Sequence, residues 1–70
     1  MSTARTHEDR AAAIAKAELK YLREGGEDDV IQAAVHGDRV FLFGKRKKVL
    51  AVYSVTWGRY RVDVKREELT

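Results

Sequence analysis

The densest group of charged side chains in the sequence runs from Lys45 to Lys48, directly after Gly44. It separates two apolar stretches, residues 39–43 and 49–55, so the pattern predicts the loop of a β-hairpin. An exposed loop with four cations and no acidic neighbour can neutralise backbone phosphates and release their counterions. The same loop also suits a solvated hairpin tip whose lysines discourage aggregation. Both interpretations stay open at this stage.

A second group of cations alternates along the last apolar segment, where Asp63 is the only acidic residue. Alternate residues of a strand project from the same face of a sheet, so these cations are expected to extend the basic surface. The residues expected to contact nucleic acid are Lys45, Arg46, Lys47, Lys48, Arg59, Arg61 and Lys65.

Positive charge is concentrated in the second half of the chain. Residues 39–66 contain nine basic residues and one acidic residue, whereas residues 1–38 contain five basic and eight acidic residues. Such asymmetry between halves indicates an anionic partner for the basic half. Nucleic acid fits this description, although the charge pattern does not distinguish DNA from RNA.

Residues suited to catalysis or metal binding are few. His7 and His36 do not stand in a metal-ligand spacing, and Ser54 lacks a nucleophile motif. The acidic run from Glu27 to Asp29 lacks the alternate spacing of a calcium-binding loop and is explained by helix capping. We therefore expect a protein that is not an enzyme and has no catalytic residue, no metal site and no cofactor.

The sequence contains no cysteine, which excludes disulfides and thiolate chemistry and is typical of a reducing compartment. Residues 1–10 are polar and lack the apolar run of a signal peptide. No segment approaches the roughly 18 apolar residues that a membrane span needs. These features predict a cytoplasmic protein without a membrane partner.

A helix is predicted at residues 7–24. Thr6 and Asp9 have the spacing of a capping box, and Gly25 with Gly26 can supply a left-handed cap at the other end. At 3.6 residues per turn, one broad apolar arc of this helix is expected to face a sheet. The arc comprises Ala11, Ala12, Ile14, Ala15, Leu19 and Leu22, with Tyr21 at its border.

Residues 28–36 admit two interpretations. In the first, Val30 to His36 is a strand followed by a two-residue turn in which Gly37 supplies a positive φ at the first position. In the second, Asp28 or Asp29 caps a short helix that Gly37 terminates. The β-branched residues and the turn favour the strand.

The expected fold is therefore α+β, with an N-terminal amphipathic helix packed on one face of an antiparallel β-meander of four strands. The alternative is an α-α-β-β-β order in which residues 28–36 form a second short helix. Within one domain, 1–70, the expected segments are a disordered tail at 1–6, a helix at 7–24, a strand or short helix at 30–36, strands at 39–44, 48–55 and 59–65, and a tail at 66–70.

Strand pairing predicts which side chains lie under the helix. With a loop at residues 44–48, Phe41 faces Ala51, and with a turn at Trp57-Gly58, Val55 faces Tyr60. The face expected under the helix then comprises Phe41, Phe43, Val49, Ala51, Tyr53, Val55, Tyr60, Val62 and Val64. The opposite face carries Val40, Leu42, Leu50 and Val52 beside the cations.

These patterns predict a small nucleic-acid-binding or nucleic-acid-associated regulatory module. It would use the basic hairpin tip and the basic last strand. The alternative is a protein-interaction module, either an adaptor or inhibitor or a homodimer, because a single domain should not leave a second apolar face exposed. The partner-binding residues of that alternative are Val40, Leu42, Leu50, Val52 and Trp57.

Overall fold

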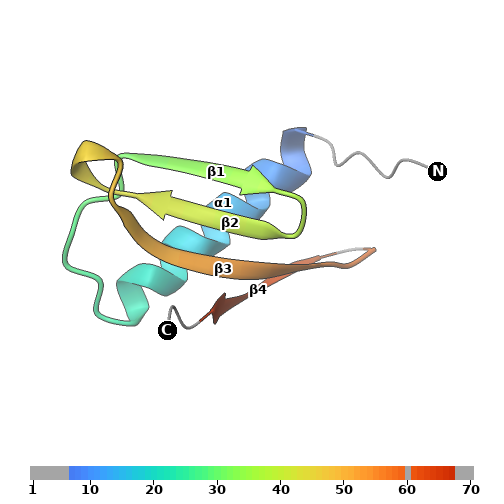
Figure 1. The fold of residues 1–70 in the computed structure, drawn as a ribbon. Coiled ribbons are helices and arrows are strands. Elements are labelled where there is room, and N and C mark those ends of the chain that lie inside the picture. Colours follow the sequence, from blue (N-terminus) through green and yellow to red (C-terminus); the bar gives the residue numbers. More distant parts are fainter. Residues whose placement is uncertain (1–6, 60, 68–70) are drawn as a thin grey trace.

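One helix lies across one face of a four-stranded antiparallel sheet (Figure 1). The computed structural model describes residues 7–59 and 61–67. The elements are α1 (His7–Arg23), β1 (Gln32–His36), β2 (Arg39–Phe43), a short 3₁₀ turn (Lys45–Lys47), β3 (Val49–Trp57) and β4 (Val62–Glu67). The strands are arranged in the order β1-β2-β3-β4.

The predicted α+β meander is confirmed, and the segment after the helix forms a strand rather than a second helix. The predicted tails at residues 1–6 and 68–70 lie outside the described residues, and residues 66–67 belong to β4 rather than to a tail.

Helix α1 ends in a pair of glycines that together satisfy its last carbonyl groups. Gly25 adopts a positive φ of 87°, a conformation that costs glycine nothing sterically. The Gly26 N–H donates to the carbonyl of Tyr21 at 2.9 Å, and the Gly25 N–H donates to that of Leu22 at 3.2 Å. This pair of bonds is a Schellman motif, and it stops the helix one residue before the predicted boundary at residue 24.

The buried face of α1 is rotated away from the predicted arc, which does not contain Ala13 or Ala17. Ala13, Ala17 and Tyr21, spaced four residues apart, are buried against the sheet, while Leu19 and Leu22 are 49% and 66% exposed. Small alanines let the helix backbone approach the sheet closely, because no long side chain separates the two layers. The predicted arc is therefore wrong for Leu19 and Leu22, and also for Ala11, Ala12 and Ala15, which are exposed.

The β1–β2 hairpin follows the predicted turn chemistry. Gly37 has a positive φ of 61° at the first turn position, as the predicted turn requires. The predicted pairs of Val35 with Val40 and of Ala33 with Leu42 are both present.

The β2–β3 pairing differs from the prediction because Leu50 is an extra residue. Phe43 pairs with Val49 as expected, but Leu42 then pairs with Ala51, and Phe41 pairs with Val52 rather than with Ala51. Such a β-bulge shifts the register by one residue and so exchanges the two faces of the neighbouring strand.

The bulge reverses the predicted faces of β2. Val40 and Leu42 are fully buried under the helix, whereas Phe41 and Phe43 lie on the opposite face. In β2 all four residues after Arg39 are apolar, so the hydrophobic pattern alone does not select a face.

The β3–β4 pairing is displaced by four residues from the prediction. Val55 pairs with Val64 rather than with Tyr60, a residue outside the described part of the chain. The connection runs from Gly58 to Arg61, whose carbonyl accepts a hydrogen bond from the Gly58 N–H at 2.9 Å, so Trp57-Gly58 is not the turn. An even-numbered shift keeps each side chain on its predicted face, and Val62 and Val64 remain in the core.

Candidate nucleic-acid interface

The basic tip, Lys45 to Lys48, connects β2 to β3 at one end of the sheet (Figure 1). The Gly44 N–H donates to the Lys48 carbonyl at 2.8 Å, and the Lys48 N–H donates to the Lys45 carbonyl at 3.2 Å, so the loop closes on itself. All four basic side chains are exposed. Within residues 7–59 and 61–67, no acidic side chain lies within salt-bridge distance of them.

The backbone of the tip is held in an unusual conformation. Arg46 and Lys47 have φ values of 60° and 59°, in the left-handed region that L-residues other than glycine rarely adopt. Each such residue costs about 1–2 kcal/mol relative to a right-handed conformation. Residues strained in this way cluster at functional sites.

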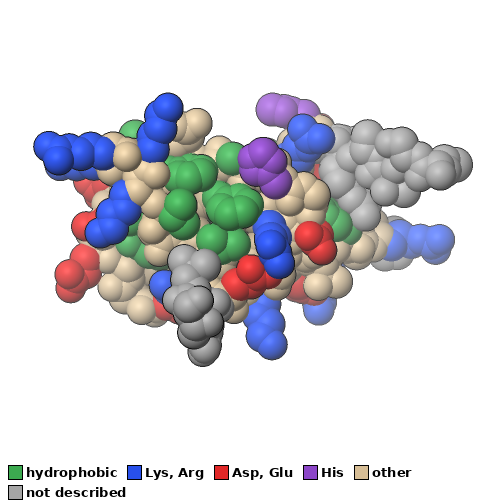
Figure 2. Space-filling view, viewed as in Figure 1, with side chains coloured by type: hydrophobic (Ala, Val, Ile, Leu, Met, Phe, Trp, Pro, Cys, Tyr) green, Lys and Arg blue, Asp and Glu red, His purple; other side chains and the backbone are tan. Residues whose placement is uncertain are grey.

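The sheet face opposite α1, called the open face here, is not covered by any described element (Figure 1). Its centre is an apolar patch made of Ala34, Phe41, Phe43 and Val52, which the register places on neighbouring strands. The Phe41 and Phe43 rings are half-buried and nearly parallel, with centroids 6.3 Å apart and an interplanar angle of 16°. Figure 2 shows hydrophobic side chains gathered at the centre of this face, with basic, acidic and histidine side chains around them.

Polar residues border the aromatic pair on the side away from the tip. The His36 ring meets the Phe41 ring edge-on, with centroids 5.8 Å apart and planes at 79°. Arg39 donates from Nε to the Glu67 carboxylate at 3.2 Å, and both side chains are substantially exposed. The open face thus presents aromatic rings between a free basic tip and a partly neutralised basic border.

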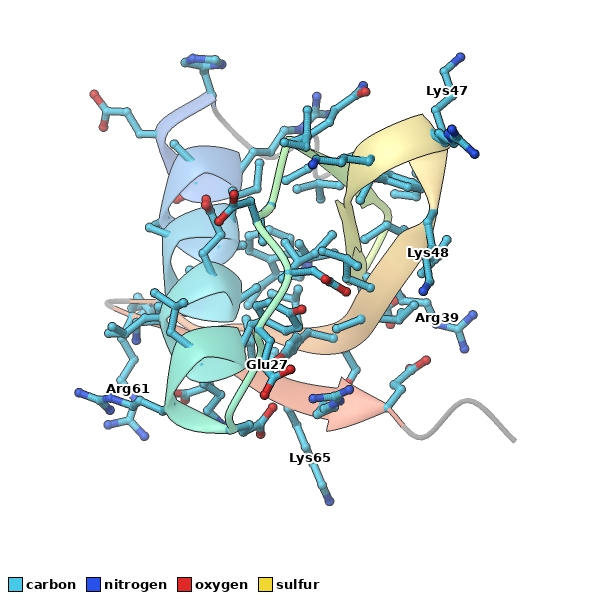
Figure 3. The ribbon with its side chains drawn as sticks, turned by 90° about the vertical axis from the view of Figure 1, so that its left-hand side faces the viewer. Glu27, Arg39, Lys47, Lys48, Arg61 and Lys65 are labelled. Atoms are coloured by element: carbon cyan, nitrogen blue, oxygen red, sulfur yellow. The ribbon has the colours of Figure 1, made fainter. Side chains whose placement is uncertain are left out.

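The cations predicted to contact nucleic acid lie in three separate parts of the structure. Figure 3 shows Lys47 and Lys48 on the side of the open face together with Arg39, while Arg61 lies on the helix side. Arg61 donates from Nε to the Asp63 carboxylate at 3.1 Å, so its charge is already compensated.

Because β4 begins at Val62, Arg59 and Arg61 precede it at the end of the sheet away from the tip. Lys65 is exposed and points away from the β4 edge (Figure 3). Among the predicted cations, only the four residues of the tip therefore form a continuous basic group.

The residues predicted to bind a protein partner are also divided. Val40 and Leu42 belong to the core and are not available to a partner, which corrects the predicted face. Leu50 and Trp57 are half-buried and pack against that core. Val52 does lie on the open face, although its neighbours leave it only 4% exposed.

Sequence reasoning missed Phe41 and Phe43 as site residues, since the predicted register placed them under the helix. The only local signal was the adjacent apolar pair Val49-Leu50 after the tip, which a bulge can accommodate but does not require.

A polar cluster joins the end of α1 to the sheet. The Tyr53 hydroxyl donates to Glu24 Oε1 at 2.9 Å, and Arg66 Nη1 donates to the same oxygen at 3.2 Å. The hydrogen bond from Tyr53 holds the pKa of the Glu24 carboxyl below its usual value, with help from Arg66. Burial, followed by the nearby Glu24, raises the pKa of Tyr53 to about 12. The cluster ties helix to sheet, and its geometry serves the fold.

Within the described part of the chain, no three histidine or acidic side chains are grouped to hold a metal ion. No helix in those residues is long and apolar enough to cross a membrane. No protein-family model, no curated protein and no solved structure matches this chain.

Proposed function

We propose that this chain is a small nucleic-acid-binding module that holds a single strand of RNA or DNA across its open face. Phe41 and Phe43 stack on two neighbouring bases, and the basic tip contacts the flanking phosphates. The observation that carries the proposal is the position of a half-buried aromatic pair on an uncovered sheet face directly before four exposed cations.

The chemistry of single strands supports this assignment. Bases of a single strand are free to stack on aromatic side chains, and each such stack contributes about 1–3 kcal/mol. Phosphates are held by exposed cations without regard to sequence. Gly44 alone separates Phe43 from Lys45, so base and phosphate contacts fall next to each other along the strand.

The proposal is tested by fluorescence anisotropy with a labelled single-stranded oligonucleotide and the matching duplex. We expect the wild-type chain to prefer the single strand. Phe41→Leu and Phe43→Leu keep an apolar side chain but remove the ring, and each should weaken single-strand binding by about fivefold or more. Their binding to the duplex should change little, because paired bases do not reach the rings.

The tip is tested against a control that removes the same charge elsewhere. Replacing the four tip residues by alanine should weaken binding and lower the slope of log K against log salt by up to about 3. The matched control replaces four exposed cations of α1 by alanine, on the other side of the sheet; these are Arg10, Lys16, Lys20 and Arg23. This variant should retain most of the affinity for the oligonucleotide. Equal losses in the two variants, or no binding at low salt, would refute the proposal.

A second candidate function is protein interaction through the same open face. The apolar patch centred on Phe41 favours it, since exposed apolar surface on a small protein is a common feature of interaction sites. In that case Phe41→Leu would leave nucleic-acid binding unchanged while it weakens capture of a protein, and the affinity for oligonucleotides would not respond to the tip.

A further inference from the structure

The two edges of the sheet differ in how they are protected. Edge strands expose unpaired backbone groups, and proteins usually protect them with charged side chains, proline or bulges. Strand β4 carries four charged residues, Asp63, Lys65, Arg66 and Glu67. Strand β1, Gln-Ala-Ala-Val-His, carries no lysine, arginine, acidic residue or proline, and it lies at the opposite edge (Figure 1).

The hydrogen bonds that β2 makes with β3 and with β1 show which backbone groups of β1 point away from the sheet. The Val55 N–H donates to the Asp38 carbonyl at 2.6 Å, so even-numbered residues from Asp38 onward bond towards β3. Odd-numbered residues of β2 therefore bond towards β1, where their partners are Gln32, Ala34 and His36. By alternation, the N–H and C=O groups of Ala33 and Val35 point away from the sheet.

We propose that β1 pairs with β1 of a second copy of this chain, antiparallel and about a two-fold axis through Ala34. Ala33 of each copy then exchanges both backbone hydrogen bonds with Val35 of the other, which satisfies all four outward groups of each strand. The two four-stranded sheets become one continuous sheet, and both helices lie on the same face. This inference does not depend on the proposed function.

A second copy fits this edge because the strand is complementary to itself. Its outward groups are symmetric about Ala34, and it has no formal charge to repel an identical strand. The symmetric pairing also places Gln32 of one copy opposite His36 of the other, and these side chains can share a hydrogen bond.

Exposed apolar surface lies beside the same edge. Ile31, immediately before β1, is 63% exposed. Together with Val30 and with Ile14 and Glu18 of α1, it lines a hollow along β1. The antiparallel pairing sets Ile31 and Ala33 opposite Gly37 and Val35 of the second copy, so part of this apolar surface would be removed from water, which adds to the backbone hydrogen bonds.

The proposal is tested by measuring the molecular mass of the full chain in solution. Sedimentation equilibrium from about 10 μM to 1 mM should show a reversible transition from the 8.0 kDa monomer to a dimer. Ala34 lies on the two-fold axis, so Ala34→Lys places two like charges directly opposite each other and should raise the dimer dissociation constant by about fivefold or more. Ala34→Glu should do the same.

Mixing the two variants provides the control for misfolding. In a heterodimer the introduced lysine of one chain would face the introduced glutamate of the other. An equimolar mixture of Ala34→Lys and Ala34→Glu should therefore dimerise more tightly than either variant alone.

Three results would contradict the pairing of β1 with a second copy. A wild-type chain that stays monomeric at about 1 mM would overturn the proposal, since β1 would then be unpaired at high concentration. So would a dimer that Phe41→Leu weakens as much as Ala34→Lys does, because both residues lie in the open-face patch and that dimer would use the open face. Capture of an extended foreign peptide by a monomer would identify another occupant for the edge and would equally overturn it.

Discussion

At the scale of single residues, Glu24 couples the stability of the fold to pH. Its folded pKa lies below its unfolded value, mainly because it accepts a hydrogen bond from Tyr53. A carboxyl group of this kind adds stability above its unfolded pKa, and that stability is lost as the pH falls through the folded pKa. Tyr53 acts in the opposite sense at high pH, since its pKa is raised to about 12. Its contribution is complete below about pH 10 and is lost as the pH rises through about 12.

We predict that Tyr53→Phe lowers the free energy of unfolding by about 1 kcal/mol at pH 7, which is less than the roughly 1.5–3 kcal/mol of a hydrogen bond to a charged group because water screens the partly exposed Glu24. The loss should shrink as the pH falls through the folded pKa of Glu24 and its carboxylate is protonated. Urea denaturation at pH 7 and at acidic pH measures both values. Arg66→Gln is a useful comparison, because it leaves the Tyr53 bond at 2.9 Å in place. An equal loss at both pH values would mean that Tyr53 acts through packing and not through Glu24.

At the scale of elements, the backbone conformation of the basic tip favours glycine at two positions where the chain has cationic side chains. Glycine would suit the left-handed conformation at positions 46 and 47, yet Arg46 and Lys47 occupy them. The proposed phosphate contacts of these two cations would therefore come at a cost in stability, as at other strained functional sites.

A pair of substitutions separates charge from conformation at Lys47. Lys47→Gly and Lys47→Ala remove the same cation, but only glycine accepts the φ of 59° without strain. We expect the glycine variant to be more stable than the alanine variant by about 1 kcal/mol in thermal unfolding. Both should bind the oligonucleotide equally weakly, since each lacks one phosphate contact. Greater stability of the alanine variant would show that the loop adopts another conformation in solution.

Element ends that are set by nearby residues could be predicted from the sequence. A strand register that depends on a single inserted residue could not. The end of α1 and the first hairpin follow from Gly25, Gly26 and Gly37, whose conformations are set within a few residues. The face of β2 depends on Leu50, and both faces of that strand are apolar, so nothing local distinguishes them. Composition alone was therefore enough to predict the basic tip, whereas the position of the aromatic pair on the open face depends on the register between β2 and β3.

At the scale of the whole molecule, positive and negative charges are separated but meet near the tip. Glu27, Asp28 and Asp29, in the connection after α1, line a hollow together with Lys45 and Lys48. Their negative potential overlaps the site proposed for phosphate and should weaken binding there. The first turn of α1, which contains Glu8, lies at the other end of the molecule, whose longest dimension is 37 Å (Figure 1).

Distance and salt together predict how neutralising one acidic residue changes affinity for single strands. At about 0.15 M salt the screening length is about 8 Å, so Glu27→Gln should tighten binding by about twofold while Glu8→Gln has no effect. At about 0.01 M salt the screening length of about 30 Å approaches the length of the molecule, and both variants should bind more tightly. At about 1 M salt neither should differ from the wild type. Anisotropy titrations at the three salt concentrations measure all of these values, and both variants have the same net charge. If Glu8→Gln matched Glu27→Gln at about 0.15 M, binding would respond to total charge, and the tip would not be the place where phosphate is held.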